Sequence, residues 1–410
     1  MGIYLGNTKI TGTGVQVDST LSQTSQHPAT NAAITDALTD LGYSAWQKPT
    51  DWIDIRSGAL PNSVYYLVGH SADYQTYPTF EVYATVSSSG TYDVYIDGVK
   101  KLSAVASGTN TTLTWSTLAL TTGYDTTYPE ALRTHIVRIT PTDSTKSITR
   151  IGGNASSATA RAGVLWVHFT LSNSIDLRYL CATANKVEAV TCSKDSMVVS
   201  GLYDAFSACP SLKEVPVFDG NNGTVSLYNS FHTASSLPKV TLRNLTTNSG
   251  SYSFAGDSSL RKITCENAFL MIGNNMFNGC EKLSELPSLS VESTTNAQLL
   301  LKGCTSLANT VLDMQDATGL TRVDVSGTST ERIDGLKGLL VSSAAPLNGT
   351  RPQINASYTG LNRAALVNLF NSLPTVSDTQ VCNITGATGA DDLTAADLAI
   401  ATGKGWTVTR

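Results

Sequence analysis

Apolar positions recur at a nearly constant interval between positions 181 and 310 of the chain. In each copy an apolar residue is followed three positions later by Cys, Ala or Asp, and three further on by Leu or Val, after which apolar and polar residues alternate. The copies begin at Cys181, Phe206, Phe231, Phe254, Phe277 and Leu301. The alternation predicts a short strand with one buried face in each copy. Since a unit of this size cannot bury its apolar face alone, the pattern predicts a solenoid of stacked coils.

Equivalent residues of stacked coils form columns along the axis, so the same pattern predicts the side chains of the core. We expect one column rich in phenylalanine, one of thiols and other small residues, and one of leucines. The predicted core residues are Phe206, Cys209, Leu212, Phe231, Leu237, Phe254, Leu260, Phe277, Cys280, Leu283, Cys304 and Leu307. The pattern reappears at Met314, only about half an interval after the copy that begins at Leu301, so we expect the regular period to end after the sixth copy.

The copies share a pattern of Phe, Cys, Leu and a further apolar residue at three-residue intervals. This pattern resembles the BspA type of leucine-rich repeat. Phe206, Cys209, Leu212 and Val215 fit this lettering in full, and so does the copy that begins at Phe277. The resemblance implies a leucine-rich-repeat solenoid, to which we assign residues 173–360. Repeats of this type occur in bacterial surface adhesins and in viral proteins, and a fold alone does not define an activity.

Residues 1–42 have a different pattern, in which apolar and polar positions alternate up to Val17. Pro28 then marks the beginning of an expected helix, which carries Ile34, Leu38 and Leu41 on one face. An isolated helix of this length is marginal in water, so its apolar face predicts packing against copies of the same helix.

The stretch from Val17 to Ile34 is similar to a short segment near the N-terminus of many fibre and tail proteins of tailed bacteriophages. This resemblance implies an attachment base that forms a homotrimer and binds other virion proteins, such as those of the capsid, portal or tail. The residues assigned to attachment and trimerisation are Val17, Leu21, Pro28, Asn31, Ile34, Leu38 and Leu41. The alternative is an arbitrary strand followed by a capped helix.

Residues 43–172 contain short strand-like runs with turn signals and no helical period. Asp97 and Gly98 separate two of these runs as a tight hairpin turn. This pattern predicts a β-sandwich that resembles a jelly roll. The aromatic residues of this segment include Trp46, Trp52, Tyr65, Tyr66, Tyr74 and Tyr77. They are candidates for stacking on sugars, although cross-strand packing inside the sandwich is the favoured explanation.

Residues 361–410 are expected to form a helical C-terminal cap. Their pattern predicts a helix over 361–373, a strand over 380–385 and a short helix over 393–401. A helical unit with a polar outer face is a usual cover for the last apolar layer of a solenoid. The Lys-Gly-Trp turn at 404–406 resembles the ending of BspA-like virion proteins. The fold class expected for the whole chain is mainly β.

Charge and hydropathy exclude several classes of partner. Lys and Arg number 27 against 32 Asp and Glu, which gives a net charge of −5, and no block of like charge is present. We therefore expect no nucleic-acid partner. No run approaches the roughly 18 apolar residues of a membrane span, and the first residues carry no cluster of positive charge. We expect neither membrane insertion nor secretion by the usual signal.

Few residues carry a signature of catalysis or of cofactor binding. The five histidines are scattered singly, and no metal, nucleotide or nucleophile motif occurs. His135 and His168 lie in expected strands, where hydrogen-bonded structural roles are favoured. The seven cysteines are expected to be packing residues, with a bridge between Cys280 and Cys304 left open. We expect no cofactor, no metal and no enzymatic activity.

The favoured interpretation is a structural protein of a tailed bacteriophage. It would be a head or tail fibre, located in the virion and assembled in the host cytoplasm, that contacts a host surface glycan or protein. The first alternative is a BspA-like adhesin of a bacterial cell surface. The second is a glycan-degrading tailspike, which needs two carboxylates across a groove. Carboxylates in the sandwich segment are Asp51, Asp54, Asp73 and Asp97.

Overall fold

The computed structural model shows a mainly β protein, and the described residues include two α-helices, both near the C-terminus. The residues that the structure describes are 3–5, 8–10, 46–50, 52–70, 79–114, 133–153, 161, 163–287, 289–290, 300–307, 310–314, 322–328, 330–334, 336, 354–376 and 380–410. The chain divides into two compact units, Met1–Gln47 and Lys48–Arg410.

In the first unit, β1 (Ile3–Leu5) and β2 (Thr8–Ile10) pair in antiparallel fashion. The predicted attachment helix and the residues assigned to it lie outside the described residues: Val17, Leu21, Pro28, Asn31, Ile34, Leu38 and Leu41.

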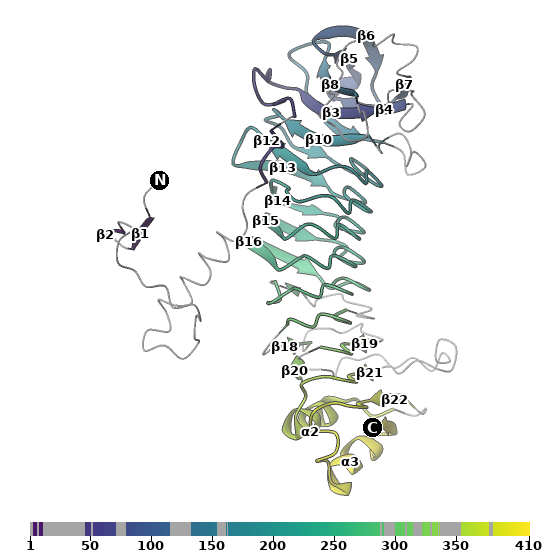
Figure 1. Cartoon of the computed structure of the whole chain (residues 1–410). Helices are drawn as coiled ribbons and strands as arrows, with labels where there is room; N and C mark the ends of the chain where they lie inside the picture. Colours follow the sequence, from purple (N-terminus) through teal and green to yellow (C-terminus); the bar gives the residue numbers. More distant parts are fainter. Residues whose placement is uncertain are drawn as a thin grey trace. The chain divides into compact units, whose positions relative to one another are not determined.

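The described strands between residues 64 and 169 form two packed sheets (Figure 1). They are β3 (Val64–His70), β4 (Thr79–Val86), β5 (Thr91–Ile96), β6 (Val99–Ala106), β7 (Asn110–Thr114), β8 (Arg133–Pro141), β9 (Ile148–Gly152) and β10 (Val164–Phe169), with the short 3-10 helix η1 (Ser87–Ser89) after β4. One sheet has the order β10-β3-β8-β5-β6, and the other the order β9-β4-β7. The sheets meet in the core, where the ring of Tyr66 lies 5.2 Å from that of Phe80.

The turn between β5 and β6 is the hairpin that the sequence predicts at Asp97 and Gly98. The two strands pair directly across it, and both turn residues have positive φ, 49° and 79°. These angles are those of a type I′ turn, which Asp and Gly adopt readily. The Asp97 carboxylate also lies 2.5 Å from Nδ1 of His135, which ties the turn to β8. The hairpin prediction is confirmed.

The second sheet continues into the solenoid without a gap. β11 (Ile175–Asp176) pairs in parallel with β9 on one side and with β13 (Ser196–Gly201) on the other. The resulting nine-stranded sheet has the order β17-β16-β15-β14-β13-β11-β9-β4-β7. The first sheet reaches the same coils because β12 (Ala189–Cys192) pairs in parallel with β10. The packed sheets and the solenoid therefore share hydrogen-bonded sheets and one hydrophobic core.

Each coil contributes a parallel strand to one side of the solenoid and a turn to another. The remaining strands of the large sheet are β14 (Val217–Val225), β15 (Lys239–Thr247), β16 (Lys262–Met271) and β17 (Leu289–Ser290). The turns are joined as well, as by the hydrogen bond of 2.8 Å from the Ala208 N–H to the carbonyl of His232. One turn position has a left-handed φ of 54° to 80° in nine successive coils, at Thr183, Ala208, Thr233, Gly256, Gly279, Gly303, Gly327, Tyr358 and Gly386. The predicted solenoid is confirmed, with about nine turns.

The phenylalanine column forms a continuous stack in the core. Ring centroids lie 5.3 Å apart between Phe206 and Phe231, 5.3 Å between Phe231 and Phe254, and 5.7 Å between Phe254 and Phe277. These rings are fully buried, and so is the column of Leu212, Leu237, Leu260, Leu283 and Leu307. Because burying a large apolar side chain stabilises a fold by about 1.5–3 kcal/mol, these two columns hold the coils together.

The thiol column bonds to the backbone of the preceding coil. Cys280 Sγ donates to the carbonyl of Phe254 at 3.1 Å, and Cys304 Sγ donates to that of Phe277 at 3.0 Å. Cys209 makes the equivalent contact in an earlier coil. All seven cysteines are free thiols, so Cys280 and Cys304 are not bridged. Burial raises the pKa of the Cys304 thiol to about 12, which keeps it protonated and able to donate at neutral pH.

The expectation that the period ends after the sixth copy is wrong. Turn hydrogen bonds place Val325, Ala356 and Ile384 after Leu301 in the same column. The interval from Leu301 to Val325 equals that from Phe277 to Leu301, so it is the ordinary period and Met314 begins no coil. The interval from Ala356 to Ile384 is longer because it contains a helix.

Two small parallel sheets and two helices follow the large sheet. The strands are β18 (Thr310–Asp313), β19 (Val323–Asp324), β20 (Thr330–Asp334), β21 (Ile354–Asn355), β22 (Gln380–Asn383) and β23 (Trp406–Thr409), with β18 paired to β20 and the others in the order β19-β21-β22-β23. Asn362 caps α2 (Arg363–Ser372), and a capping box of Thr394 and Asp397 begins α3 (Ala395–Thr402). Both predicted helices are confirmed, and each cap sets the beginning slightly later than expected.

The Lys-Gly-Trp turn fastens the end of the chain to α2. Lys404 Nζ donates to three carbonyl oxygens at 2.7 to 3.0 Å, those of Phe370, Asn371 and Leu373. These groups lie at the C-terminal end of α2, where carbonyls lack partners within the helix and a positive charge is favourable. Trp406, which follows in the same turn, is buried, and its indole N–H donates to the carbonyl of Pro374 at 2.8 Å. The turn therefore holds β23 against the helix.

Asp257 replaces the thiol in the fourth coil of the small-residue column. Its side chain is fully buried, and neither carboxyl oxygen has a hydrogen-bond partner among the described residues. Burial raises the pKa of this carboxyl well above its ordinary value of 3.8, and the backbone of Ala234 opposes the rise only in part. Because the ionised form is disfavoured in the core, Asp257 lowers the stability of the fold increasingly as the pH rises above its ordinary pKa.

We expect Asp257→Cys to raise the free energy of unfolding at pH 7 by about 1–4 kcal/mol, by analogy with the range for replacing a buried ion pair by packed apolar residues. The gain should shrink as the pH falls toward about 4, where the wild-type carboxyl is neutral in the folded state and becomes neutral in the unfolded one. Denaturant titrations at several pH values measure the effect. The exposed Asp391 offers a control, and Asp391→Asn should show no comparable pH-dependent gain. Equal stabilities of wild type and Asp257→Cys at pH 7 would contradict the prediction.

Candidate functional site: a tyrosine ladder on the solenoid turns

Four tyrosines follow one another along the turns of the first coils. Tyr179, Tyr203, Tyr228 and Tyr252, here called the tyrosine ladder, come from four successive coils, and Tyr203 and Tyr228 lie one position earlier in their coils than Tyr179 and Tyr252 do. Their ring centroids lie 5.6, 5.0 and 6.4 Å apart in that order. The central pair is stacked with its planes 15° apart, and the outer rings meet it edge to face. All four side chains are half-buried.

The backbone of the ladder is unusual for tyrosine. Tyr179 and Tyr252 have φ of 61° and 58°, in the left-handed region that bulky side chains rarely adopt. The turn hydrogen bonds place Asp204 and Asn229 at the same position in the second and third coils, with φ of 52° and 55°. Asp and Asn tolerate this conformation, whereas for other residues it costs on the order of 1–3 kcal/mol. The first and fourth coils therefore keep an aromatic ring in the ladder at a cost in stability.

Polar side chains lie in the middle of the ladder. Asn229 Nδ2 donates to Oδ1 of Asp204 and, at 3.1 Å, to Oγ of Ser207. The ring of His232 packs edge to face against Tyr252 at a centroid distance of 6.1 Å. Burial raises the pKa of Asp204 and lowers that of His232, and the attraction between the two charged forms opposes the shift of His232. His232 is therefore neutral at pH 7.

The phenols of the ladder are suited to binding. Burial raises the pKa of Tyr203 and Tyr228 above the ordinary value of 10, so both hydroxyls are protonated at neutral pH and can donate and accept hydrogen bonds. Tyrosine combines a large rigid ring with a polar group, and it is enriched among the residues that contribute most to binding interfaces. The ladder thus offers an aromatic contact surface with hydrogen-bonding groups at its centre.

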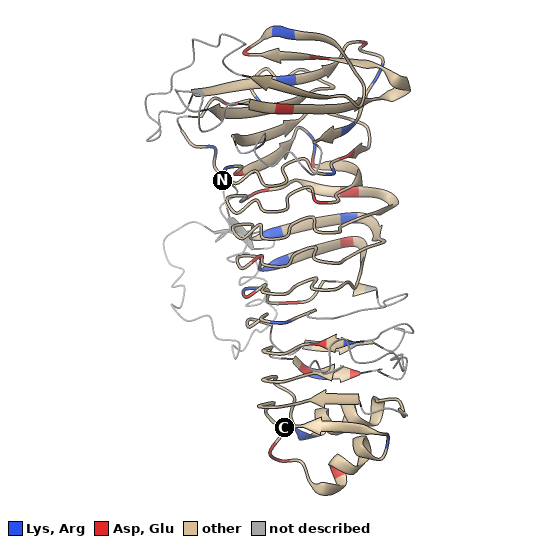
Figure 2. Ribbon diagram, turned by 90° about the vertical axis from the view of Figure 1, so that its right-hand side faces the viewer, with Lys and Arg blue, Asp and Glu red and all other residues tan. Residues whose placement is uncertain are grey.

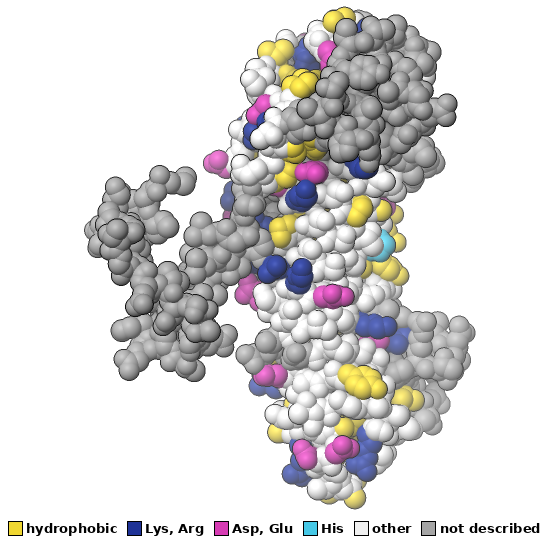
Figure 3. Space-filling model, viewed as in Figure 1, with side chains coloured by type: hydrophobic (Ala, Val, Ile, Leu, Met, Phe, Trp, Pro, Cys, Tyr) yellow, Lys and Arg dark blue, Asp and Glu magenta, His cyan; other side chains and the backbone are white. Residues whose placement is uncertain are grey.

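The turn side and the strand side of the coils differ in character. Hydrophobic side chains gather along the right-hand edge of the upper coils in Figure 3, among polar ones. On the strands, basic and acidic residues are interspersed in Figure 2. Arg243 of β15 and Glu266 of β16, for example, form an ion pair of 2.6 Å on neighbouring strands. The aromatic surface therefore belongs to the turns.

The aromatic candidates of the sandwich segment do not form a sugar platform in the described part of that segment. Trp52, Tyr65 and Tyr66 are only 4–6% exposed. For these three the packing explanation is confirmed, and the sugar-stacking hypothesis is wrong because their faces are covered by the core. Trp46 is partly exposed, and Tyr74 and Tyr77 lie outside the described residues.

The histidines in the strands have structural roles, as the sequence predicts. His168 is buried, with Nδ1 at 2.9 Å from the hydroxyl of Thr191 and Nε2 at 3.0 Å from that of Ser193. Burial lowers the pKa of His168 to about 4, so its ring is neutral at pH 7. His135 is also buried and contacts Asp97, as described above.

Two of the four carboxylates considered for glycan cleavage are described, and each has a partner of its own. Asp54 forms an ion pair of 2.8 Å with Arg56, and this guanidinium holds the pKa of the carboxyl at about 2. Asp97 belongs to the hairpin turn and contacts His135. Asp51 and Asp73 lie outside the described residues. The structure does not bring Asp54 and Asp97 together as a pair.

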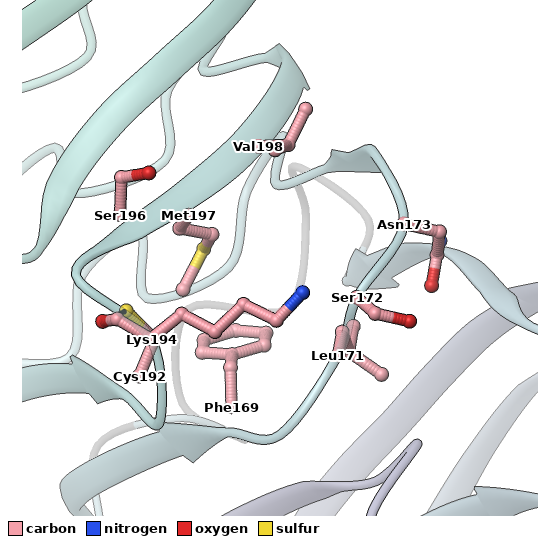
Figure 4. A pocket seen from close by; sticks show the side chains of 9 residues that line it. All are labelled: Phe169, Leu171, Ser172, Asn173, Cys192, Lys194, Ser196, Met197 and Val198. Atoms are coloured by element: carbon pink, nitrogen blue, oxygen red, sulfur yellow. Dashed lines mark hydrogen bonds between the residues drawn. The ribbon is translucent and has the colours of Figure 1, made fainter.

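A small pocket lies where the packed sheets meet the solenoid. Figure 4 shows its lining, in which Phe169, Lys194 and Met197 point into the space. The thiol of Cys192, another lining residue, donates to the carbonyl of Lys194 at 3.0 Å. The volume open to the centre of a water molecule is about 20 Å³, which is enough for one water. The pocket is therefore too small for an organic ligand.

The part of the chain that the structure describes contains no group of three or more His, Cys, Asp or Glu side chains placed to hold a metal ion. Its helices are also too short or too polar to cross a membrane.

The sequence interpretation missed the tyrosine ladder, although a signal for it was present. The four tyrosines are 24, 25 and 24 residues apart, each within one residue of the 25, 25 and 23 that separate Cys181, Phe206, Phe231 and Phe254 of the core column. This second aromatic series is hard to recognise because it lies outside the core and shifts by one position between coils. A search for aromatic residues at the coil period, away from the core positions, would have found it.

Comparison with protein families identifies the repeats themselves. Residues 186–314 match, in six copies, the family described as BspA type Leucine rich repeat region. No curated protein and no solved structure matches the chain. The matched range contains the phenylalanine and leucine columns and the ladder tyrosines Tyr203, Tyr228 and Tyr252. Three of the four ladder tyrosines therefore lie in coils that match the model of BspA-type leucine-rich repeats.

Proposed function

We propose that this protein is a non-enzymatic adhesion protein that binds surface molecules through the turn side of its solenoid. The observation that carries the proposal is the tyrosine ladder, most of which lies in the coils that match the BspA-type repeat, and such repeats suggest a surface adhesin. The ladder rings already pack against one another in the free protein. Such preorganisation favours binding, because little side-chain freedom remains to be lost.

We infer that the solenoid is closed at both ends. At the C-terminal end, α2 buries Leu366, Leu369 and Phe370, which supports a helical cap within residues 361–410. At the other end, the chain passes repeatedly between the two packed sheets from β3 to β10, which supports a jelly-roll-like domain within residues 43–172. A solenoid closed in this way leaves its sides for binding.

We further propose that the protein is a head or tail fibre of a tailed bacteriophage. The support is the similarity of residues 17–34 to the attachment segments of such fibres. Residues 1–42 would form a homotrimer and bind a capsid, portal or tail protein, and residues 173–360 would contact a host surface glycan or protein. The protein would then be located in the virion after assembly in the host cytoplasm. A BspA-like adhesin of a bacterial cell surface would bind in the same manner and differ in location.

The double variant Tyr203→Ala/Tyr228→Ala tests the adhesion role. We expect binding of the fluorescently labelled protein to those strains of a bacterial panel that the wild type binds to weaken about tenfold or more, because central aromatic residues dominate binding energy. Flow cytometry measures the binding, and circular dichroism checks that the variant is folded. Phe269→Ala is the matched control, since Phe269 is a 52% exposed aromatic residue on strand β16. Undiminished binding by the folded double variant would exclude the ladder as the adhesive surface.

Sedimentation equilibrium of the full chain tests the oligomeric state. We expect a trimer, and we expect Ile34→Asp/Leu38→Asp to sediment as a monomer because a charge on the apolar face of the proposed helix opposes its packing. The surface substitution Asp391→Asn should leave the trimer intact. A monomeric wild-type protein would refute the proposed attachment helix.

Mass spectrometry of phage particles tests the location. Particles purified by density gradient from a culture that carries the gene should contain this protein at a constant ratio to the major capsid protein. Recovery of the protein only from the bacterial envelope fraction would favour the cell-surface adhesin instead.

A further inference from the structure

We propose that the tyrosine ladder binds a neutral, hydroxyl-rich glycan chain that lies along the solenoid axis across four coils. The proposal rests on the adhesion role proposed above and names the ligand of the same surface. Four properties of the described residues support it: the line of the rings, the surplus of hydrogen-bond acceptors, the near absence of charge, and the strained backbone.

The line of the rings calls for an extended ligand. The tyrosines occupy consecutive coils, at centroid distances of 5.0 to 6.4 Å, so a ligand that touches all four must run parallel to the axis. Tyr203 and Tyr228 are stacked with an offset, so each ring covers part of the face of the other. A ligand therefore meets ring edges and phenol groups, which suits a chain with alternating C–H and O–H groups along its length.

The hydrogen-bonding groups at the centre call for a ligand that donates. The Asn229 amide donates within the ladder, to Asp204 and to Ser207. No described residue donates to Oδ2 of Asp204 or to Oδ1 of Asn229, so these acceptors are open to a partner. Sugar hydroxyls supply such donors. A proline-rich peptide, the other extended ligand of aromatic surfaces, has no N–H at its prolines.

The charges of the ladder favour a neutral ligand. Asp204 is its acidic group, and His232 is uncharged at neutral pH. The nearest basic residue in the sequence, Arg178, is already paired with Asp176 at 2.7 Å. A polyanion such as a nucleic acid or a sulfated glycan would find no unpaired positive charge among these residues. A polycation would find one carboxylate, which is too little for strong attraction at physiological salt.

The strained backbone indicates that the rings serve binding. At the position of Tyr179 and Tyr252, Asn, Asp or Gly fits a left-handed φ better than tyrosine does. The second and third coils have Asp204 and Asn229 there, each directly after its ladder tyrosine. In the first and fourth coils, Tyr179 and Tyr252 lengthen the stack from two rings to four. Other turns of the solenoid carry similar strain, as at Tyr358, so the strain supports a binding role only together with the line of the rings.

Isothermal titration calorimetry of the full chain tests the proposal with three soluble neutral polysaccharides, an α-mannan, a β-glucan and a galactan. We expect at least one to bind with an affinity that changes little between about 0.05 and 0.5 M salt, because no ion pair is involved. Tyr203→Ala/Tyr228→Ala should weaken this binding about tenfold or more. Tyr203→Phe keeps the ring and removes the hydroxyl, so it should weaken the polysaccharide binding less. It replaces the double variant in the test if the double variant does not fold. Tyr358→Ala is the control, since Tyr358 is 69% exposed and lies outside the ladder.

The outcomes separate this proposal from the adhesion role. Binding of none of the three polysaccharides overturns the glycan proposal, and so does binding of a sulfated glycan, a polyproline peptide or oligolysine in their place. Glycan binding that survives the folded ladder variants overturns it too, because the site would then lie elsewhere. If the polysaccharides fail while the double variant loses binding to cells, the adhesion role stands with a different ligand.

Discussion

Stacking of equivalent side chains from coil to coil is the interaction on which the rest of this structure depends. The Phe231 and Phe254 rings lie 5.3 Å apart and within 2° of parallel. This contact exists only if neighbouring coils are in register. The same register aligns the turn hydrogen bonds, the thiol contacts and the tyrosines on the outside. A single periodic constraint thus produces both the core and the candidate binding surface.

Periodicity made the core predictable from the sequence. Coils whose residues depart from the repeated pattern could not be predicted in the same way. Columns of phenylalanine and leucine are visible because each position repeats one kind of side chain. Later in the chain, Val325 occupies the phenylalanine column and Thr328 the thiol column. A pattern defined by Phe, Cys and Leu does not recognise this coil, so it predicts too few coils. A bulge in β14 likewise makes the copy that begins at Phe206 longer than its successor. The ladder was missed because half-buried positions show no sharp alternation, and only their spacing reveals them.

Some positions hold a residue that fits the repeat poorly, and two examples lie in different environments. Asp257 places a carboxyl in the small-residue column of the core, and Tyr252 places a bulky ring on a left-handed turn. In each case the coils on either side keep the position in register, since turn and strand hydrogen bonds continue past it. A stacked repeat can therefore accommodate a residue that lowers the stability of the fold locally, which an isolated turn or strand would not tolerate.

The uninterrupted sheet from β7 to β17 has a mechanical consequence. A pull on the packed sheets is passed to the coils through backbone hydrogen bonds, since β9, β11 and β13 are joined edge to edge. There is no flexible linker at that junction to absorb the load. The coils and the packed sheets would extend together as one mechanical unit. The pair of neighbouring strands with the weakest hydrogen bonding would set the force at which the unit unfolds.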